Sequence, residues 1–344
     1  MARKGFFLRL KGEGQSTLTK GGTVQAKTLF TGAPHVLSGK QFPRRWLEEE
    51  LFPLSESMGE VASSRTMNAL LGRRVRLLFY EPSERTLDSF VSACDLLGAR
   101  NTWLGNPEIF SSQAKGESLA DMIRVICRYH YDLIVMRSKQ QGEVEKAASV
   151  SGRVPVINAG DGPGEHPTQA LLDAFTIHRE LGTIDDVSIA LVGDLHYSRT
   201  IRSLAFMLPQ WNVGRIAFVG PPNWRVGEDV RAFLDDNGVC YSEGTDLAAV
   251  ASEVDIVYLT RAQTERTNLA MRFLDSPDQK VCVTLTDEVL ERMPGHARVM
   301  HPLPRNDEFG ELPEEFTDHP KVIIFDEVYN GLLIRMALLQ MLLG

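Results

Sequence analysis

The strongest constraint on the fold is an alternation between short apolar segments and segments with helical spacing of apolar residues, from about His35 onward. Such apolar runs predict strands that are buried on both faces of a sheet. The expected strands are 74–80, 132–136, 154–159, 187–192, 215–219, 255–259, 280–285, 299–301 and 322–325. The expected helices are 44–58, 86–97, 118–129, one that begins near Pro167, 200–208, 226–237, 287–292 and a last one over about 330–343.

This alternation predicts an α/β protein with two doubly wound parallel-sheet domains. The chain has 344 residues, which is enough for two domains of ordinary size. In parallel sheets of this kind, ligands bind at the carboxyl ends of the strands. The residues that follow each expected strand are therefore the candidates for a functional site.

Composition excludes several function classes. The net charge of −8 argues against a dedicated nucleic-acid binder, whose affinity would come from clustered Lys and Arg. No segment approaches the roughly 18–20 apolar residues of a membrane span. The four cysteines are far apart with no C-x-x-C pair, and the histidines show no metal-binding spacing. We expect a cytoplasmic or organellar enzyme, with the cytoplasm favoured, with free thiols and without a tightly bound metal.

The first 33 residues differ from the rest of the chain. Six basic residues oppose one acidic residue, Glu13, so this segment carries +5 and the remainder −13. We interpret 1–33 as a basic, mobile extension. A transit peptide is the alternative, because organellar targeting segments are basic and poor in acidic residues.

The segment after strand 74–80 combines features of a phosphate site. It reads Glu81-Pro82-Ser83-Glu84-Arg85-Thr86 and opens a helix. Free backbone N–H groups at a helix start, together with hydroxyl groups and an arginine, bind phosphate well. An ordinary Ser N-cap with an acidic first turn explains the same residues, and the segment alone does not decide between the two.

Other strand ends also carry polar and basic residues. His166 and Gln169 follow strand 154–159, and His301 ends strand 299–301. Arginines follow further strands: Arg137, Arg199, Arg261, Arg266 and Arg305. Arginines gathered in this way in an acidic chain indicate a pocket for a multiply anionic substrate. No P-loop and no G-x-S-x-G element is present, which disfavours a P-loop nucleotide-binding protein and a serine hydrolase.

Taken together, these segments resemble the aspartate/ornithine carbamoyltransferase family, from about His35 to the C-terminus. The matching stretches are FYEPSERTLDSF (79–90), AKGESLAD (114–121), IVMR (134–137), NAGDGPGEHPTQALLDAFTI (158–177), VGDLHYSRTIRSL (192–204), YLTRAQTER (258–266), MHPLPRNDE (300–308) and NGLLIRMALL (330–339). The ordered set HPTQ, TRxQxER and MHPLPR is highly specific.

The resemblance implies a carbamoyl-phosphate-binding domain over 34–170, completed by a C-terminal helix over 329–344 that returns to it, and an aspartate-binding domain over 171–328. It implies transfer of the carbamoyl group from carbamoyl phosphate to the amino group of L-aspartate, giving N-carbamoyl-L-aspartate and phosphate, a step of pyrimidine biosynthesis. It also implies a homotrimer with shared active sites and no cofactor. A regulatory or pathway-enzyme partner stays open.

The resemblance also assigns roles on the donor side. Ser83, Arg85 and Thr86 match phosphate-binding positions. Arg137 and His166, with Thr86, match groups that hold the carbonyl oxygen of the carbamoyl group. A contact to the carbamoyl nitrogen matches Gln169. Two further positions, Ser111 and Lys115, match a loop that reaches into the site of a neighbouring subunit.

On the acceptor side, Arg199, Arg261 and Gln263 match contacts to the aspartate carboxylates, which favours aspartate over ornithine. The backbone carbonyls of Pro302 and Leu303 match acceptors around the amino group. Glu81 matches a residue that pairs with Arg199 and Arg266 when the domains close.

Two positions of the donor motif depart from the family pattern, which has Ser-Thr-Arg-Thr-Arg where this chain has Ser83-Glu84-Arg85-Thr86-Leu87. A carboxylate about 4 Å from a phosphate charge costs on the order of 4 kcal/mol at an effective dielectric constant near 20. Glu84 could instead turn outward or pair with Lys115, and Leu87 could replace a structural arginine by packing. Near the C-terminus, Asp326 and Glu327 also stand where the family commonly has neutral or basic residues.

Three hypotheses follow. The first is a working enzyme that carbamoylates aspartate. The second is an enzyme of the same fold with a changed donor or acceptor. The third is a weakly active or inactive relative with a binding or assembly role.

Overall fold

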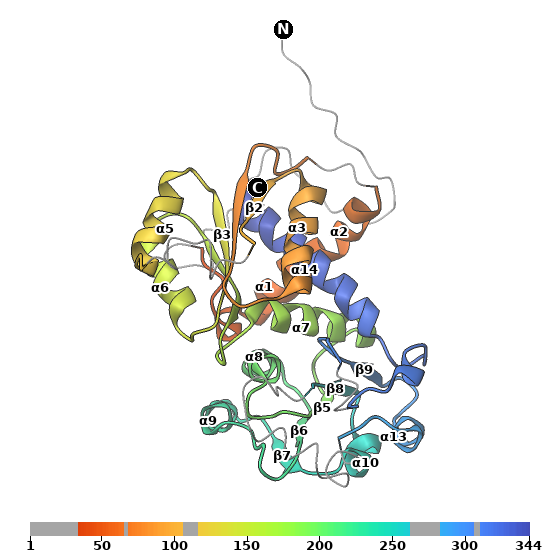
Figure 1. Cartoon of the computed structure of the whole chain (residues 1–344). Helices are drawn as coiled ribbons and strands as arrows, with labels where there is room; N and C mark the ends of the chain where they lie inside the picture. Colours follow the sequence, from red (N-terminus) through yellow and green to blue (C-terminus); the bar gives the residue numbers. More distant parts are fainter. Residues whose placement is uncertain (1–33, 65–67, 106–115, 262–282, 306–309) are drawn as a thin grey trace.

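The computed structural model describes residues 34–64, 68–105, 116–261, 283–305 and 310–344. Figure 1 shows two sheets, each with helices on both faces, and the long helix α14 beside the first sheet. All strand pairs in both sheets are parallel. The predicted α/β class with two parallel sheets is confirmed. Within the described ranges, no helix has the length and apolar character needed to cross a bilayer.

The first sheet has the strand order β2-β1-β3-β4. Its strands are β1 (Arg74–Phe79), β2 (Arg100–Trp103), β3 (Leu133–Ser138) and β4 (Val156–Asp161). In β3, Val135 packs into one buried cluster with α3 (Glu84–Leu97), while Met136 packs into another with α5 (Leu119–Arg128) and α6 (Glu143–Val150). Helices on both faces explain why residues 133–136 of this strand are all apolar.

The second sheet has the order β7-β6-β5-β8-β9. Its strands are β5 (Ser188–Val192), β6 (Arg215–Val219), β7 (Tyr241–Gly244), β8 (Ile256–Leu259) and β9 (Arg298–Met300). Its flanking helices are α8 (Arg199–Met207), α9 (Glu228–Asp236), α10 (Leu247–Val250) and α13 (Asp287–Arg292). Because the chain winds outward from β5 in both directions, the strand order reverses between β5 and β8, and this is where such sheets bind ligands.

Helix α7 (Pro167–Leu181) connects the two sheets. It starts at a proline, as predicted, and ends before Gly182, whose φ of 78° suits a glycine C-cap. Its residues are buried from Pro167 to Ile177. Helix α14 (Ile324–Leu343) packs against α7, α3 and α2 (Phe52–Ser64), so the C-terminal helix returns to the first sheet as expected.

Helix α2 continues a helical stretch that consists of α1 (Arg44–Trp46) and the π-helical η3 (Leu47–Leu51). Short 3-10 segments link other elements: η2 (Gly39–Gln41), η5 (Leu208–Gln210), η6 (Ala251–Glu253) and η8 (Glu314–Phe316).

Two predicted strands are wrong in their described parts. Residues 283–285 of the expected strand 280–285 form a turn and coil, and 280–282 lie outside the described residues. The expected strand 322–325 is only an isolated bridge between Val322 and Val299, and α14 begins at Ile324 rather than near residue 330. A short apolar run does not distinguish a strand from a buried helix start. Here Asp326 and Glu327 occupy the first turn of the helix, where acidic residues are favourable.

The edge strands β2 and β7 are not predicted by the sequence pattern. Neither contains a run of apolar residues, and neither is fully buried at any position. An edge strand packs on fewer neighbours than a central one, so the hydrophobic pattern that marks the inner strands is weak in these two segments.

Candidate active site

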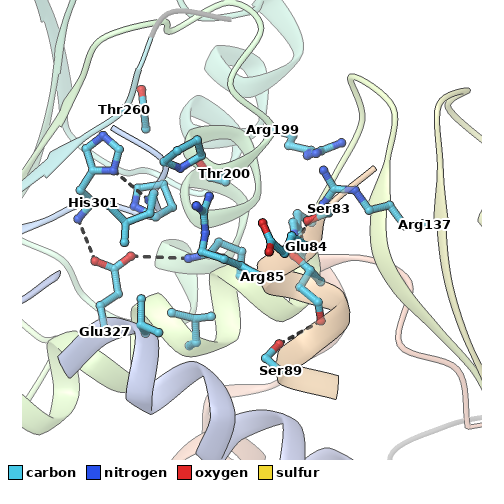
Figure 2. Close-up of a pocket in the computed structure, with 18 of the residues that line it drawn as sticks. Ser83, Glu84, Arg85, Ser89, Arg137, Arg199, Thr200, Thr260, His301 and Glu327 are labelled. Carbon is cyan, nitrogen blue, oxygen red and sulfur yellow. Dashed lines mark hydrogen bonds between the residues drawn. The ribbon is translucent and has the colours of Figure 1, made fainter. Parts of the chain in front are cut away.

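A cavity of about 360 Å³ lies between the carboxyl ends of the two sheets. Figure 2 shows its side chains converging from the start of α3, from β3, and from the elements of the second sheet. Eleven predicted site residues line it: Glu81, Ser83, Arg85, Thr86, Arg137, His166, Gln169, Arg199, Arg261, Pro302 and Leu303. Topology therefore gathers residues that are as far apart in sequence as 81 and 303.

The remaining predicted site residues cannot be placed. Ser111, Lys115, Gln263 and Arg266 lie outside the described residues.

The start of α3 has the character of an anion site. Ser83 is the N-cap residue, but its side chain does not cap the helix, and its hydroxyl donates instead to the Thr86 hydroxyl at 3.0 Å. The Ser83 side chain therefore does not act as an ordinary N-cap. The first-turn residues Glu84, Arg85 and Thr86 line the cavity, so the positive N-terminal end of this 14-residue helix lies at its edge.

Arg85 contributes positive charge beside this helix start. Burial and the nearby positive charge of Arg261 lower its pKa, while Glu84 acts in the opposite direction. An arginine on α3, beside the first sheet, and one that follows β8 of the second sheet thus lie close enough to repel each other. A dianion between them would relieve that repulsion.

Glu81 connects the two sheets through two arginines. Its Oε2 lies 3.1 Å from Nε of Arg137 on β3 and 2.6 Å from Nη1 of Arg199 at the start of α8. Carbonyl groups hold the same guanidinium groups, Ala159 at 3.2 Å for Arg137 and Gly162 at 3.0 Å for Arg199. The expected Glu81–Arg199 pair is present, and the Glu81–Arg137 pair is an addition that the sequence analysis missed.

His166 is buried between the same arginines. Its backbone N–H donates to the Ser203 hydroxyl at 2.8 Å, and its Nδ1 lies 3.2 Å from the Thr168 hydroxyl. Burial, together with the positive charges of Arg137 and Arg199, holds the pKa of His166 well below its usual value of 6.5. The imidazole is therefore neutral at neutral pH, and one ring nitrogen donates while the other accepts.

The segment after β9 supplies backbone acceptors. The Leu303 N–H donates to His301 Nδ1 at 2.8 Å, and Leu303 has a φ of 52°. No described residue donates a hydrogen bond to the carbonyl of Pro302 or of Leu303. Both residues line the cavity, so these carbonyls are suited to receive an amino group.

Glu84 is exposed at the edge of the cavity, whereas Leu87 is absent from its described lining and packs against the core. The packing role expected for Leu87 agrees with this position. The charge of Glu84 is partly screened by water, so its effect on a bound phosphate is smaller than the cost at a dielectric constant near 20.

Several polar lining residues were missed as site candidates, among them Thr200, Glu327 and Arg335. Glu327 had a signal, because its acidic character departs from the family pattern. Arg335 and Thr200 had none beyond lying within matched segments. Among the described residues, no group of three His, Cys, Asp or Glu side chains is placed to hold a metal ion.

Comparison with known proteins identifies the class. Residues 34–179 match the family model for the carbamoyl-P binding domain of aspartate/ornithine carbamoyltransferase, and residues 185–342 match the model for its Asp/Orn binding domain. The chain belongs to the aspartate/ornithine carbamoyltransferase family.

Individual relatives agree. Over 309 residues, the chain is 43% identical to the chloroplastic aspartate carbamoyltransferase of Arabidopsis thaliana, covering 90% of this chain and 77% of the relative. It is also 43% identical to an aspartate carbamoyltransferase catalytic subunit of Methanothrix thermoacetophila, covering 90% and 98%. A solved structure of Trypanosoma cruzi aspartate transcarbamoylase with N-(phosphonacetyl)-L-aspartic acid matches with a TM-score of 0.84 at 35% identity, covering 93% and 98%.

Proposed function

We propose that the chain transfers the carbamoyl group of carbamoyl phosphate to the amino group of L-aspartate, giving N-carbamoyl-L-aspartate and phosphate, in pyrimidine biosynthesis. The observation that carries this proposal is one cavity that joins the start of α3 with Arg199, Arg261 and the Pro302–Leu303 carbonyls. The family membership supports the same chemistry.

On the donor side, the phosphate lies at the start of α3, where Ser83, Arg85 and Thr86 bind it. Arg137, His166 and Thr86 donate hydrogen bonds to the carbonyl oxygen, on which negative charge grows as the amine attacks. Donors that are fixed before the reaction lower this barrier without reorganising. Gln169 holds the carbamoyl nitrogen.

On the acceptor side, Arg199 and Arg261, with Gln263, bind the two carboxylates of aspartate. The carbonyls of Pro302 and Leu303 orient the amine toward the carbonyl carbon. The new C–N bond forms as the C–O bond to phosphate breaks, and the amine proton leaves with phosphate or solvent. Holding both reactants in one cavity replaces an encounter in solution by a preoriented pair.

The two halves of the chain divide this work. We assign 34–170 with 329–344 to the donor and 171–328 to the acceptor, joined through α7. Closure draws Glu81 against Arg199 and Arg266, which excludes water from the reactive donor. The Glu81–Arg199 contact supports this assignment.

We further propose a homotrimer in which Ser111 and Lys115 complete the site of a neighbouring subunit. Sedimentation velocity of the full chain tests the assembly, and mixing Lys115→Ala chains with Arg85→Ala chains tests sharing. Recovery of activity in mixed trimers supports a shared site, and its absence in confirmed mixed trimers contradicts it.

We propose that the protein is located in the cytoplasm. Fractionation of cells that express the full chain with a C-terminal tag tests this, and recovery in plastids or mitochondria would contradict it. The Arabidopsis relative described above is chloroplastic.

Product analysis tests the proposed reaction. The purified chain is given carbamoyl phosphate with L-aspartate or L-ornithine, and products are identified by mass spectrometry. We expect N-carbamoyl-L-aspartate with one phosphate released per product. Arg85→Ala should lower the rate about a hundredfold or more, because it removes a side chain that donates hydrogen bonds to the phosphate. Arg128→Ala, an exposed arginine on α5, is the matched control. Carbamoylated ornithine alone, or no product, would contradict the proposal.

A further inference from the structure

Two acidic side chains lie side by side beneath the cavity. Asp173 on α7 and Glu327 on α14 are both buried, with 0% and 1% of their surface exposed. Both carboxyl groups lie against the same amide nitrogen, that of Gln169, and each raises or lowers the pKa of the other. Tyr258 on β8 donates its hydroxyl to Asp173 Oδ2 at 2.9 Å. Glu327 itself lines the cavity, whereas Asp173 lies behind it.

The pair fixes the orientation of Gln169. The Gln169 amide nitrogen donates to Asp173 Oδ1 at 2.9 Å and lies 3.5 Å from Glu327 Oε1. An amide oxygen in that position would face two carboxyl groups, so only the NH₂ group suits it. The Gln169 side-chain oxygen is then left for the cavity, where it can accept a hydrogen bond from an amide N–H.

The other oxygen of Glu327 reaches the acceptor side. Glu327 Oε2 accepts the backbone N–H of His301 at 2.7 Å, and Figure 2 shows this bond as a dashed line between the two labelled residues. His301 in turn holds Leu303 through its Nδ1, and its Nε2 lies 2.9 Å from Glu311. One carboxyl group therefore contacts both halves of the cavity.

Charge balance favours one proton on the pair. Arg335 on α14 is the buried cation that acts on Asp173, and one cation balances one anion. Arg85 on α3 lines the same cavity as Glu327. Burial raises the pKa of Asp173 to about 7 and, with the repulsion from Asp173, raises that of Glu327 well above its usual range. Loss of the shared proton leaves two buried anions side by side.

We propose that Glu327 is a positioning residue that sets Gln169 on the donor side and the His301–Leu303 segment on the acceptor side, and that it does so while sharing one proton with Asp173. This inference rests on the proposed carbamoyl transfer. Activity then falls at alkaline pH, because the doubly ionised pair separates and releases both groups.

Three variants test this inference. Glu327→Leu removes both hydrogen bonds and should lower kcat/KM about tenfold or more. Glu327→Gln imitates the protonated carboxyl, so it should keep most of the wild-type kcat/KM. Its alkaline limb should lie at a pH about one unit or more higher. Asp326→Asn makes the same type of change at an exposed position on the same turn, and its alkaline limb should coincide with that of the wild type.

Superimposable alkaline limbs for wild type and Glu327→Gln would overturn the inference. A substrate-free measurement separates this result from failure of the proposed function. The wild type should show the infrared carbonyl band of a buried protonated carboxyl group, absent in Glu327→Gln. Amide hydrogen exchange around His301 should be faster in Glu327→Leu and restored in Glu327→Gln. If the infrared and exchange results are as expected in a chain without turnover, only the proposed reaction is contradicted. If these two results differ from the expectation, the positioning role of Glu327 is contradicted.

Discussion

At the residue scale, the departure that bears most on function is Glu84. It lies at the edge of the cavity, next to Arg85, the arginine that we propose binds the phosphate. Its exposure lets water screen its charge, and its attraction to Arg85 offsets part of the repulsion it exerts on a dianion. We therefore expect Glu84 to weaken the binding of carbamoyl phosphate without abolishing it.

We therefore predict that Glu84→Gln lowers KM for carbamoyl phosphate about tenfold, the effect of one exposed charge at short range. The kcat value should change less, because the phosphate is bound in both the ground state and the transition state. Steady-state kinetics across a wide donor range measures both. Asp88→Asn, which removes an exposed charge one turn further along α3, is the control. Equal KM values for Glu84→Gln and wild type would contradict the argument.

At the scale of elements, α7 organises the chemistry. It places His166 at its N-cap, Gln169 in its first turn and Asp173 one turn later, all buried. The sequence was enough to predict its start at Pro167 and the polar groups there, because both follow from strand-end topology. The Asp173–Glu327 pair could not be predicted, since it depends on how α14 packs against α7.

The pH dependence of stability follows from α7. His166 is buried as a neutral imidazole, and its folded-state pKa lies well below 6.5. Below pH 6.5 the unfolded chain therefore binds a proton that the folded chain does not, and the free energy of unfolding falls as pH falls. His166→Asn should flatten this slope in urea unfolding between about pH 5 and 7, while the exposed His196→Asn should keep it. Identical slopes in wild type and His166→Asn would contradict this assignment.

Burial explains which elements could be predicted from the sequence and which could not. Central strands such as β5 and β6 are buried on both faces, and their apolar runs marked them. The edge strands β2 and β7 lack this signal. The start of α14 was mistaken for a strand because its apolar residues are adjacent, and only its packing against α3 and α7 selects the helix.

At the scale of the whole molecule, Glu81 links the sheets at the cavity through Arg137 and Arg199. A second link lies elsewhere: Glu48 accepts from Arg44 at 2.9 Å and from Trp211 at 2.8 Å, outside the described cavity lining. The two carboxylates therefore allow the closure of the site to be separated from general cohesion between the sheets.

Glu81→Gln should lower kcat about tenfold or more, because it weakens the contact that holds both arginines in place. Glu48→Gln should lower the melting temperature while kcat stays at the wild-type value. Steady-state kinetics and thermal unfolding of both variants measure the two effects. A normal kcat in Glu81→Gln, or equal losses of kcat in both variants, would show that the link at the cavity has no special role.

Binding of the bisubstrate compound N-(phosphonacetyl)-L-aspartate, measured by titration calorimetry, tests most directly whether the two sheets build one site. We predict one saturable site per chain, weakened about tenfold or more both by Arg85→Ala from the first sheet and by Arg261→Ala from the second. Binding that responds to only one of these substitutions, or no binding to the folded chain, would contradict the account of a shared donor and acceptor cavity.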